Sequence, residues 1–282
     1  MKFAAALAAL EARQEARIEL GLDRVREHLA RLGSPHLRVP AFHVAGTNGK
    51  GASCAMLASV LRASGRRVGL YISPHLFDVR ERITVDGREI PRADFARLLS
   101  RALAADPGER LTYFELATSV AFQWFAERRC DVAVLETGLG GRLDATNVVP
   151  APLAAIVTSV DLDHQNFLGR TRARIAAQKA GIFKSGRPAV FPDLPVLRRL
   201  PKRGEPVVVR RAWRAVRVDW ARGVQVLRAP SGRTYRLSLL GVRQGRNAAL
   251  VRAAVDASGL DVGEAAWREG LSRVRWPGRF DV

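Results

Sequence analysis

The sequence predicts an α/β fold, with a mostly parallel sheet and helices on both of its faces. Short continuous apolar runs alternate with segments of helical periodicity between residues 41 and 192. Such runs are typical of strands that are buried on both faces of a parallel sheet. In addition, the apolar run 42–45 ends in a Gly-rich turn that leads directly into a helical pattern. This is the layout of a strand–turn–helix unit.

The elements follow in order along the chain. Helices are expected over residues 2–18 and 22–32, with Gly21 and Gly33 as breaks. The expected strands are 41–45, 67–72, 131–136, 153–158 and 188–192, and the helices between them are 51–64, 92–104, 113–128 and 171–182. Asp86-Gly87, inside the alternating stretch 83–90, predicts a β-hairpin. Short strands at 207–209, 216–218, 224–227 and 235–239 predict a small β-rich subregion near residues 205–240, and helices 244–258 and 263–271 follow.

Composition limits the possible partners. The net charge is +19, but only five of the 46 basic residues are Lys, and the Arg residues are spread over the whole chain without interleaved aromatic residues. This pattern is unlike a nucleic-acid-binding face. Apolar runs stay well short of the roughly 20 residues of a membrane span. Two isolated cysteines, Cys54 and Cys130, fit a reducing compartment. We therefore expect a cytoplasmic protein with no nucleic-acid or membrane partner. We also expect a monomer.

The turn Gly46-Thr47-Asn48-Gly49-Lys50-Gly51 carries the most chemical information. Glycines let the backbone approach a phosphate, amide N–H groups at a helix start face the anion, and a Lys ammonium reaches the terminal phosphates. The spacing is not the standard one, because the first Gly and the Gly before Lys50 are only three residues apart. An ordinary strand-to-helix turn is the alternative interpretation. We expect nucleotide binding.

Other polar residues also follow predicted strands, where ligands bind in open parallel sheets. Ser73, Glu136 and His164 combine a hydroxyl, a carboxylate and an imidazole, and such a set is suited to a divalent cation that bridges nucleotide phosphates. Taken singly, each has a structural alternative: a turn residue before Pro74, a capping carboxylate and an imidazole beside a helix. Their shared position at strand ends favours the metal site.

Several motifs along nearly the whole chain resemble the folylpolyglutamate synthase and dihydrofolate synthase family, within the Mur-ligase superfamily of ATP-dependent amide ligases. They include Leu20-Gly21-Leu22-Asp23-Arg24, the turn at 46–51, Ser73-Pro74-His75-Leu76, Thr112-Tyr113-Phe114-Glu115, Glu136-Thr137-Gly138-Leu139-Gly140-Gly141-Arg142-Leu143-Asp144-Ala145, Lys179-Ala180-Gly181-Ile182 and Pro277-Gly278-Arg279. The resemblance implies that residues 1–282 form N-terminal helices and an ATP-binding central domain of the P-loop NTPase type.

The resemblance also implies ligands and site residues. The implied ligands are ATP, Mg²⁺ at two sites, dihydropteroate or folate, and L-glutamate. Thr47, Asn48, Gly49, Lys50, Gly51, Asn247 and Arg279 would bind ATP. Ser73, Glu136, His164 and a carbamylated Lys179 would hold the metals, with Lys50, His164 and Lys179 as the catalytic residues. Glu19, Leu20, Gly21, Thr112, Tyr113, Phe114, Glu115, Leu143, Asp144 and Ala145 would line the pterin site. A surface charge on a helix is the alternative interpretation of Lys179.

Three departures from the family pattern stand out. Ala52 follows Gly51 where the family has Ser or Thr, Arg243 replaces a His, and the sequence ends at Val282 where family members continue into a second, smaller domain. We therefore expect that domain to be absent from this chain, as a fragment or a truncated protein, and the chain alone to be inactive in amide synthesis. The rival functions are a Mur ligase that acts on a cell-wall nucleotide precursor and a non-catalytic nucleotide-binding module.

Overall fold

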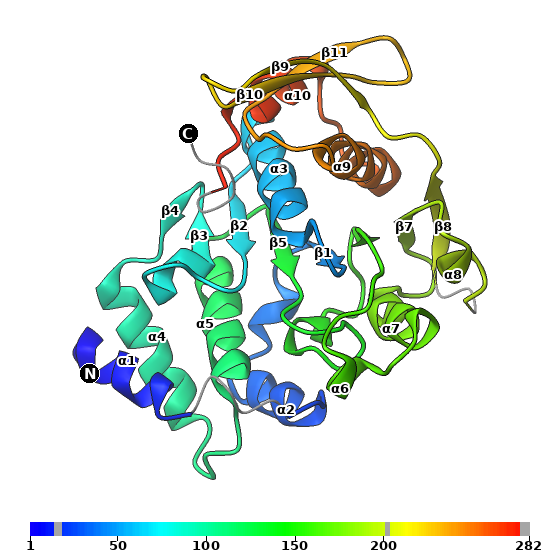
Figure 1. Ribbon diagram of the computed structural model, residues 1–282. Helices are drawn as coiled ribbons and strands as arrows, with labels where there is room; N and C mark the ends of the chain where they lie inside the picture. The colour runs from blue at the N-terminus through cyan, green and yellow to red at the C-terminus, as the bar shows by residue number, and fades with distance from the viewer. Residues whose placement is uncertain (14–18, 201–203, 277–282) are drawn as a thin grey trace.

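The computed structural model describes residues 1–13, 19–200 and 204–276. Within these ranges an eight-stranded sheet has the order β4-β3-β2-β5-β1-β6-β7-β8, with helices on both faces (Figure 1). Strands β2, β5, β1, β6, β7 and β8 are parallel, and β3 and β4 form an antiparallel edge. The bounds are β1 (Ala41–Ala45), β2 (Val68–Tyr71), β3 (Ile83–Val85), β4 (Arg88–Glu89), β5 (Val132–Glu136), β6 (Ala154–Val157), β7 (Pro188–Pro192) and β8 (Glu205–Val209).

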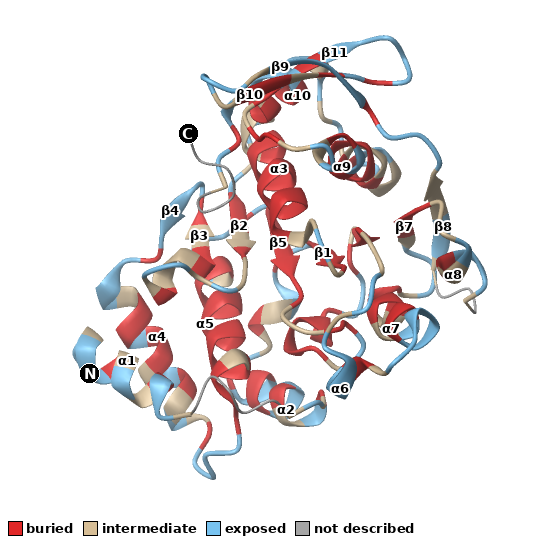
Figure 2. Ribbon diagram, in the orientation of Figure 1, coloured by how far each residue is buried: buried red, intermediate tan, exposed pale blue. Residues whose placement is uncertain are grey.

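The predicted α/β class and the mostly parallel sheet are confirmed. Every residue of β1 and β5 is buried (Figure 2), and so is every residue of β6, which explains their continuous apolar runs. Successive side chains of one strand enter different layers. Ala41 packs into the cluster on one face of the sheet, whereas Phe42 and Val44 pack into the cluster on the other.

The helices divide between these two faces. Their bounds are α1 (Phe3–Glu11), α2 (Asp23–Arg31), α3 (Lys50–Ala63), α4 (Arg92–Ala104), α5 (Tyr113–Glu127), α6 (Gln165–Leu168), α7 (Arg172–Lys179), α8 (Pro195–Arg198), α9 (Gln244–Ser258) and α10 (Glu264–Arg273), with 3₁₀ turns at Pro35–Leu37, Val79–Arg82, Ala145–Val148 and Ala180–Ile182. Helices α1, α2, α4 and α5 supply one core cluster, α3, α9 and α10 supply a second, and α7 and α8 supply a third (Figure 1). Among the described residues, no helix is both long and apolar enough to cross a membrane.

A second, antiparallel sheet confirms the expected β-rich subregion. It consists of β9 (Arg214–Asp219), β10 (Val224–Arg228) and β11 (Thr234–Leu237), in the order β11-β10-β9. It lies over α10 and α3 in Figure 1, and Leu227 and Leu237 join the core cluster that contains those helices. The prediction was wrong in one respect, because Val207 to Val209 belongs to β8 in the main sheet, where it pairs in parallel with β7. A short Val-rich run does not itself specify which sheet it joins.

Two predicted helices are shorter than expected. Helix α1 ends at Glu11, and residues 14–18 of the predicted helix lie outside the described residues. Helix α7 ends at Lys179 and continues only as the 3₁₀ turn Ala180–Ile182. At Gly181 an added Cβ would lie 2.3 Å from the Cβ of Arg142, so the chain passes close to another loop there. Lys179 therefore occupies the last position of the helix rather than its middle.

Candidate active site

The Gly-rich turn lies between the end of β1 and the start of α3, at the centre of the sheet. Gly49 has φ +87° and precedes the first residue of α3, a left-handed conformation that glycine adopts without strain. At Gly46 an added Cβ would lie 1.9 Å from the Thr158 Oγ1 atom. Both glycines are therefore required by the local geometry, as expected for a turn in which the backbone must be open to a ligand.

The segment after β6 holds this turn in place. Thr47 N donates to Ser159 O over 3.1 Å, and Asn48 N donates to the Ser159 hydroxyl over 2.9 Å. The Thr158 hydroxyl donates to Asn48 O over 2.7 Å. The turn is thus fixed by contacts with a neighbouring strand end, so little ordering is needed when a ligand binds.

Lys50 closes the turn. Its Nζ donates to Gly46 O over 3.1 Å and to Thr47 O over 3.5 Å. The ammonium group therefore lies over the turn at the N-terminus of the 14-residue helix α3. A positive side chain and the positive end of the helix dipole both favour an anion here.

Asn247 and Trp276 lie against the other side of the turn. An added Cβ at Gly49 would lie 2.7 Å from the Asn247 Oδ1 atom, and one at Gly51 would lie 2.0 Å from Trp276 Cζ2. The structure thus brings the predicted Asn247 to the turn. Trp276 was not predicted, because no local motif marks it. Arg279 lies outside the described residues.

Ser73, which follows β2, lies next to Glu136, the last residue of the neighbouring strand β5. The Ser73 backbone N–H donates to Glu136 Oε2 over 3.2 Å, and Glu136 is buried. Burial raises the pKa of the Cys54 thiol, the Glu136 charge adds to the rise, and the Lys50 charge opposes it. Glu136 and Lys50 therefore both lie within electrostatic reach of the same buried thiol.

Lys179 and His164 have different surroundings. Lys179 is only 2% exposed. Its burial, together with the positive charge of Lys50, lowers the Lys179 pKa to about 8, while Asp163 acts in the opposite direction. His164 is left-handed at φ 46°, more than half exposed, and its Nε2 lies 3.7 Å from Asp163 Oδ1. The interpretation of Lys179 as a surface charge is wrong, because this side chain is buried within electrostatic reach of Lys50.

The four candidate metal ligands include a hydroxyl and a lysine, so they are not a typical cluster of carboxylates and imidazoles. Among the described residues, no group of three or more His, Cys, Asp and Glu side chains is arranged to hold a metal ion. The convergence of His164 and Lys179 with the Ser73–Glu136 pair stays a prediction.

An arginine joins the first two segments of the predicted substrate site. The Nη2 atom of Arg24 donates to Glu115 Oε1 and to Glu19 O, each over 3.0 Å. Glu115 also accepts from Thr112 N and Oγ1 over 2.9 and 3.0 Å, which completes a capping box at the start of α5. The stretch at 19–21 and the stretch at 112–115 therefore lie side by side. Our sequence interpretation gave Arg24 no role, although it lies in the same motif as Leu20 and Gly21.

The third substrate segment borders the second. An added Cβ at Gly138 would lie 2.7 Å from Phe114 Cζ, so the loop after β5 packs on the Phe114 ring. Within that loop, Asp144 Oδ2 accepts from Leu139 N over 2.8 Å. The loop that contains residues 143–145 is thus a closed turn next to the start of α5.

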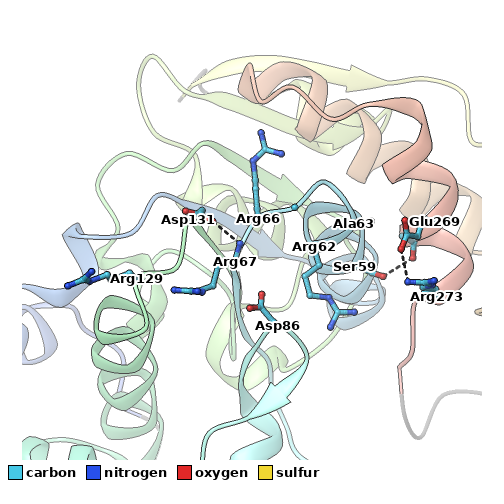
Figure 3. A pocket seen from close by; sticks show the side chains of 12 residues that line it. Ser59, Arg62, Ala63, Arg66, Arg67, Asp86, Arg129, Asp131, Glu269 and Arg273 are labelled. Carbon is cyan, nitrogen blue, oxygen red and sulfur yellow. Dashed lines mark hydrogen bonds and ion pairs between the residues drawn. The ribbon is translucent and has the colours of Figure 1, made fainter.

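A cavity of about 650 Å³ lies elsewhere, at the other end of α3 (Figure 3). Arg62 in its wall is twelve residues after Lys50 on the same helix, a distance of about 18 Å along the axis. Its lining mixes both signs of charge and includes Arg62, Arg66, Arg67, Asp86, Arg129, Asp131, Glu269 and Arg273. In Figure 3, Glu269 and Arg273 pair with each other at one side of the cavity. This cavity is not the site that the motifs predict.

Comparisons with known proteins agree with the fold and the motifs. Residues 44–254 match the Mur ligase middle domain. The Escherichia coli dihydrofolate synthase/folylpolyglutamate synthase is 41% identical over 272 residues, which cover 94% of this chain and 63% of the relative. The Bacillus subtilis protein of the same description is 37% identical, with 94% of this chain and 66% of the relative covered. The chain thus spans about two thirds of the length of these relatives.

Solved structures give the same result. The E. coli FolC complex with DHPP and ADP has a TM-score of 0.86 at 40% identity and covers 100% of this chain and 68% of that one. An FPGS-AMPPCP-folate complex has a TM-score of 0.87 at 31% identity and covers 99% and 73%. The chain therefore belongs to the Mur ligase family and, within it, to the branch of the dihydrofolate and folylpolyglutamate synthases.

Proposed function

We propose that this protein takes part in an ATP-dependent amide ligation that joins L-glutamate to the carboxylate of dihydropteroate or a folate. The observation that carries the proposal is the preformed turn at 46–51 with the Lys50 ammonium above it, in a chain whose relatives are described as dihydrofolate and folylpolyglutamate synthases. In the first step the substrate carboxylate attacks the γ-phosphorus of ATP and expels ADP. In the second, the glutamate amine attacks the acyl phosphate and expels inorganic phosphate.

The phosphates of ATP would lie on the turn. Backbone N–H groups of residues 49–51, at the start of α3, and the Lys50 ammonium offer positive charge there, and Asn247 is in contact with the same turn. Solved relatives contain ADP or AMPPCP, which supports a nucleotide as a ligand of this chain. Arg279 is proposed as a further contact to ATP. Catalysis then depends mainly on positioning and charge neutralisation, so no protein nucleophile is required.

The residues present are chemically suited to Mg²⁺. Glu136 supplies a buried carboxylate beside Ser73, and oxygen ligands are those that Mg²⁺ prefers. We propose that Ser73, Glu136 and His164 hold the ion, which would neutralise phosphate charge when bound. A carbamate on Lys179 would supply the carboxylate for a second ion. The lowered pKa of Lys179 supports this, because carbamylation requires the neutral amine.

The carbamate has a direct test. In ¹³C NMR with labelled bicarbonate, the wild-type chain should show one carbamate signal that disappears in Lys179→Met. No such signal in the wild type would remove Lys179 from the proposed metal site, without affecting the proposal for the nucleotide turn.

The pterin part of the substrate would bind where three segments meet. These are residues 19–21, 112–115 and 143–145, joined by the Arg24 contacts and by the packing of Phe114 on Gly138.

We also propose a monomer that acts in the cytoplasm. The two cysteines, both buried and unpaired, are consistent with a reducing compartment.

The function is tested with the gene product that carries this sequence. With dihydropteroate, ATP and L-glutamate, it should form dihydrofolate and ADP in equal amounts. Turnover of UDP-linked cell-wall precursors in place of dihydropteroate would move the assignment to the other Mur ligases. ATP binding without either reaction would identify a non-catalytic nucleotide-binding module.

Lys50→Met tests the nucleotide turn itself. Loss of a charge-assisted contact should weaken ATP binding at least about tenfold in calorimetry. Lys2→Met, which removes an exposed lysine, should leave it unchanged. Equal ATP affinity for Lys50→Met and the wild type would contradict the assignment of the turn.

A further inference from the structure

A buried histidine lies on β1 just before the nucleotide turn. His43 is 0% exposed, and its Nε2 lies 2.8 Å from the Thr146 hydroxyl oxygen. Its neighbours Phe42 and Val44 belong to the core cluster that includes α3. Since side chains alternate along a strand, His43 is directed to the opposite face of the sheet, where the loop after β5 lies.

The hydrogen bonds beyond Thr146 end at a carboxylate. The Thr146 hydroxyl is 2.5 Å from Asp144 Oδ1, and Thr146 N donates to the same oxygen over 3.0 Å. The other oxygen, Oδ2, accepts from Leu139 N over 2.8 Å. Burial raises the pKa of Asp144, whereas the hydrogen bonds from Thr146 and from the backbone N–H groups of the loop oppose the rise. An ionised carboxylate only accepts hydrogen bonds, so with Asp144 ionised the hydroxyl proton of Thr146 is directed to Asp144.

This direction fixes the histidine tautomer. Because the Thr146 hydroxyl donates to Asp144, its oxygen must accept from His43, and His43 therefore carries its proton on Nε2. The other ring nitrogen, Nδ1, is buried without a partner among the described residues. An unpaired lone pair there is less costly than an unpaired N–H, so the arrangement agrees with the Nε2–H form.

The ring also stays neutral. Burial, together with the positive charge of Lys184, lowers the pKa of His43 to about 3. The hydrogen bonds from His43 to Thr146 and from Thr146 to Asp144 therefore keep the same donors and acceptors throughout the pH range in which an ordinary histidine titrates.

We propose that His43 is a positioning residue, whose Nε2–H orients Thr146 and thereby fixes Asp144 and the loop after β5. The inference rests on the proposed function, in which this loop lines the pterin part of the substrate site. His43 touches neither substrate nor nucleotide. It connects the strand that carries the nucleotide turn with the loop that shapes the second substrate pocket.

The first test does not depend on activity. In ¹⁵N NMR of the imidazole groups, His43 should be neutral and protonated at Nε2 between about pH 5 and about pH 8. A ring protonated at Nδ1 would reverse the hydrogen-bond chain and overturn the inference.

The second test compares substitutions at His43 with a matched control. His43→Leu removes the donor and should raise the KM for dihydropteroate about tenfold, with the KM for ATP changed less than about twofold. His43→Gln keeps an N–H donor near the position of Nε2 and should stay within about threefold of the wild type. His28→Leu removes a similar buried pair, in which His28 Nε2 lies 2.8 Å from the Ser119 hydroxyl, and should leave both KM values unchanged.

The outcomes separate the two proposals. Equal effects of His43→Leu and His28→Leu on the KM for dihydropteroate, or failure of His43→Gln to restore it, would show that His43 is only a core residue. If His43→Leu does not fold, His43→Gln and the NMR measurement still decide the question. A wild-type protein that does not use dihydropteroate would refute the proposed function, whereas the tautomer result would remain valid for the fold.

Discussion

Lys179→Met should stabilise the folded chain, and it should do so only at low and neutral pH. Lys179 is 2% exposed, and its pKa falls from 10.5 to about 8 in the folded chain. Between these two values the unfolded chain binds more protons than the folded chain, so the free energy of unfolding rises with pH. Lys179 therefore destabilises the fold fully below about pH 8, and the destabilisation disappears above the pKa of the unfolded chain.

The size of the effect follows from the pKa difference. From 10.5 to about 8 is about 2.5 units, and at 1.36 kcal/mol per unit this is about 3 kcal/mol. Methionine has a similar length and carries no charge. Lys179→Met should therefore raise the free energy of unfolding by up to about 3 kcal/mol near pH 7, and by close to zero at about pH 10.5.

Urea unfolding provides the assay. Wild type, Lys179→Met and the exposed control Lys2→Met are compared near neutral pH and at about pH 10.5. The buffers are degassed and contain a chelator, so that neither carbamate nor metal contributes. The control should show no gain at either pH. The reasoning from burial would be refuted if Lys179→Met did not raise the free energy of unfolding near neutral pH, or raised it equally at both pH values.

Two further predictions concern stability. Gly46→Ala should cost about 1–3 kcal/mol, because its Cβ would meet the Thr158 hydroxyl at 1.9 Å and because φ is +154°. Gly108→Ala, where the nearest atoms would lie at an ordinary contact distance of 3.5 Å, should leave the melting temperature nearly unchanged, and equal losses for the two variants would contradict the clash. Arg24→Ala leaves the carboxylate of Glu115 buried without its cation and should cost about 3 kcal/mol in urea unfolding. Adding Glu115→Gln should recover part of that cost, and no recovery would show that packing by the arginine is the cause.

Local patterns were enough to predict most of the fold. Helix α4, strand β7 and helix α9 have the predicted bounds, because apolar periodicity and nearby breakers such as Pro91 and Gly259 are local signals. The sheet to which β8 belongs could not be predicted, since that depends on pairing with β7. The early end of α7 at Lys179 likewise depends on the close passage of a distant loop.

The site divides in the same way. The turn at 46–51 and the Ser73–Glu136 pair follow from motifs at the ends of neighbouring strands. The contact of Trp276 with Gly51 and the link from His43 to Asp144 depend on side chains far apart in the sequence. Residue spacing carries no signal for such contacts, so only the folded structure reveals them.

The proposed reaction is tested most directly by following one oxygen atom. Dihydropteroate labelled with ¹⁸O in its carboxylate is incubated with ATP, L-glutamate and the gene product that carries this sequence. If the carboxylate attacks the γ-phosphorus and glutamate then displaces phosphate, each inorganic phosphate should contain one ¹⁸O atom for each dihydrofolate formed. Dihydrofolate formed with unlabelled phosphate would contradict the acyl phosphate, and phosphate released without dihydrofolate would contradict the ligase assignment.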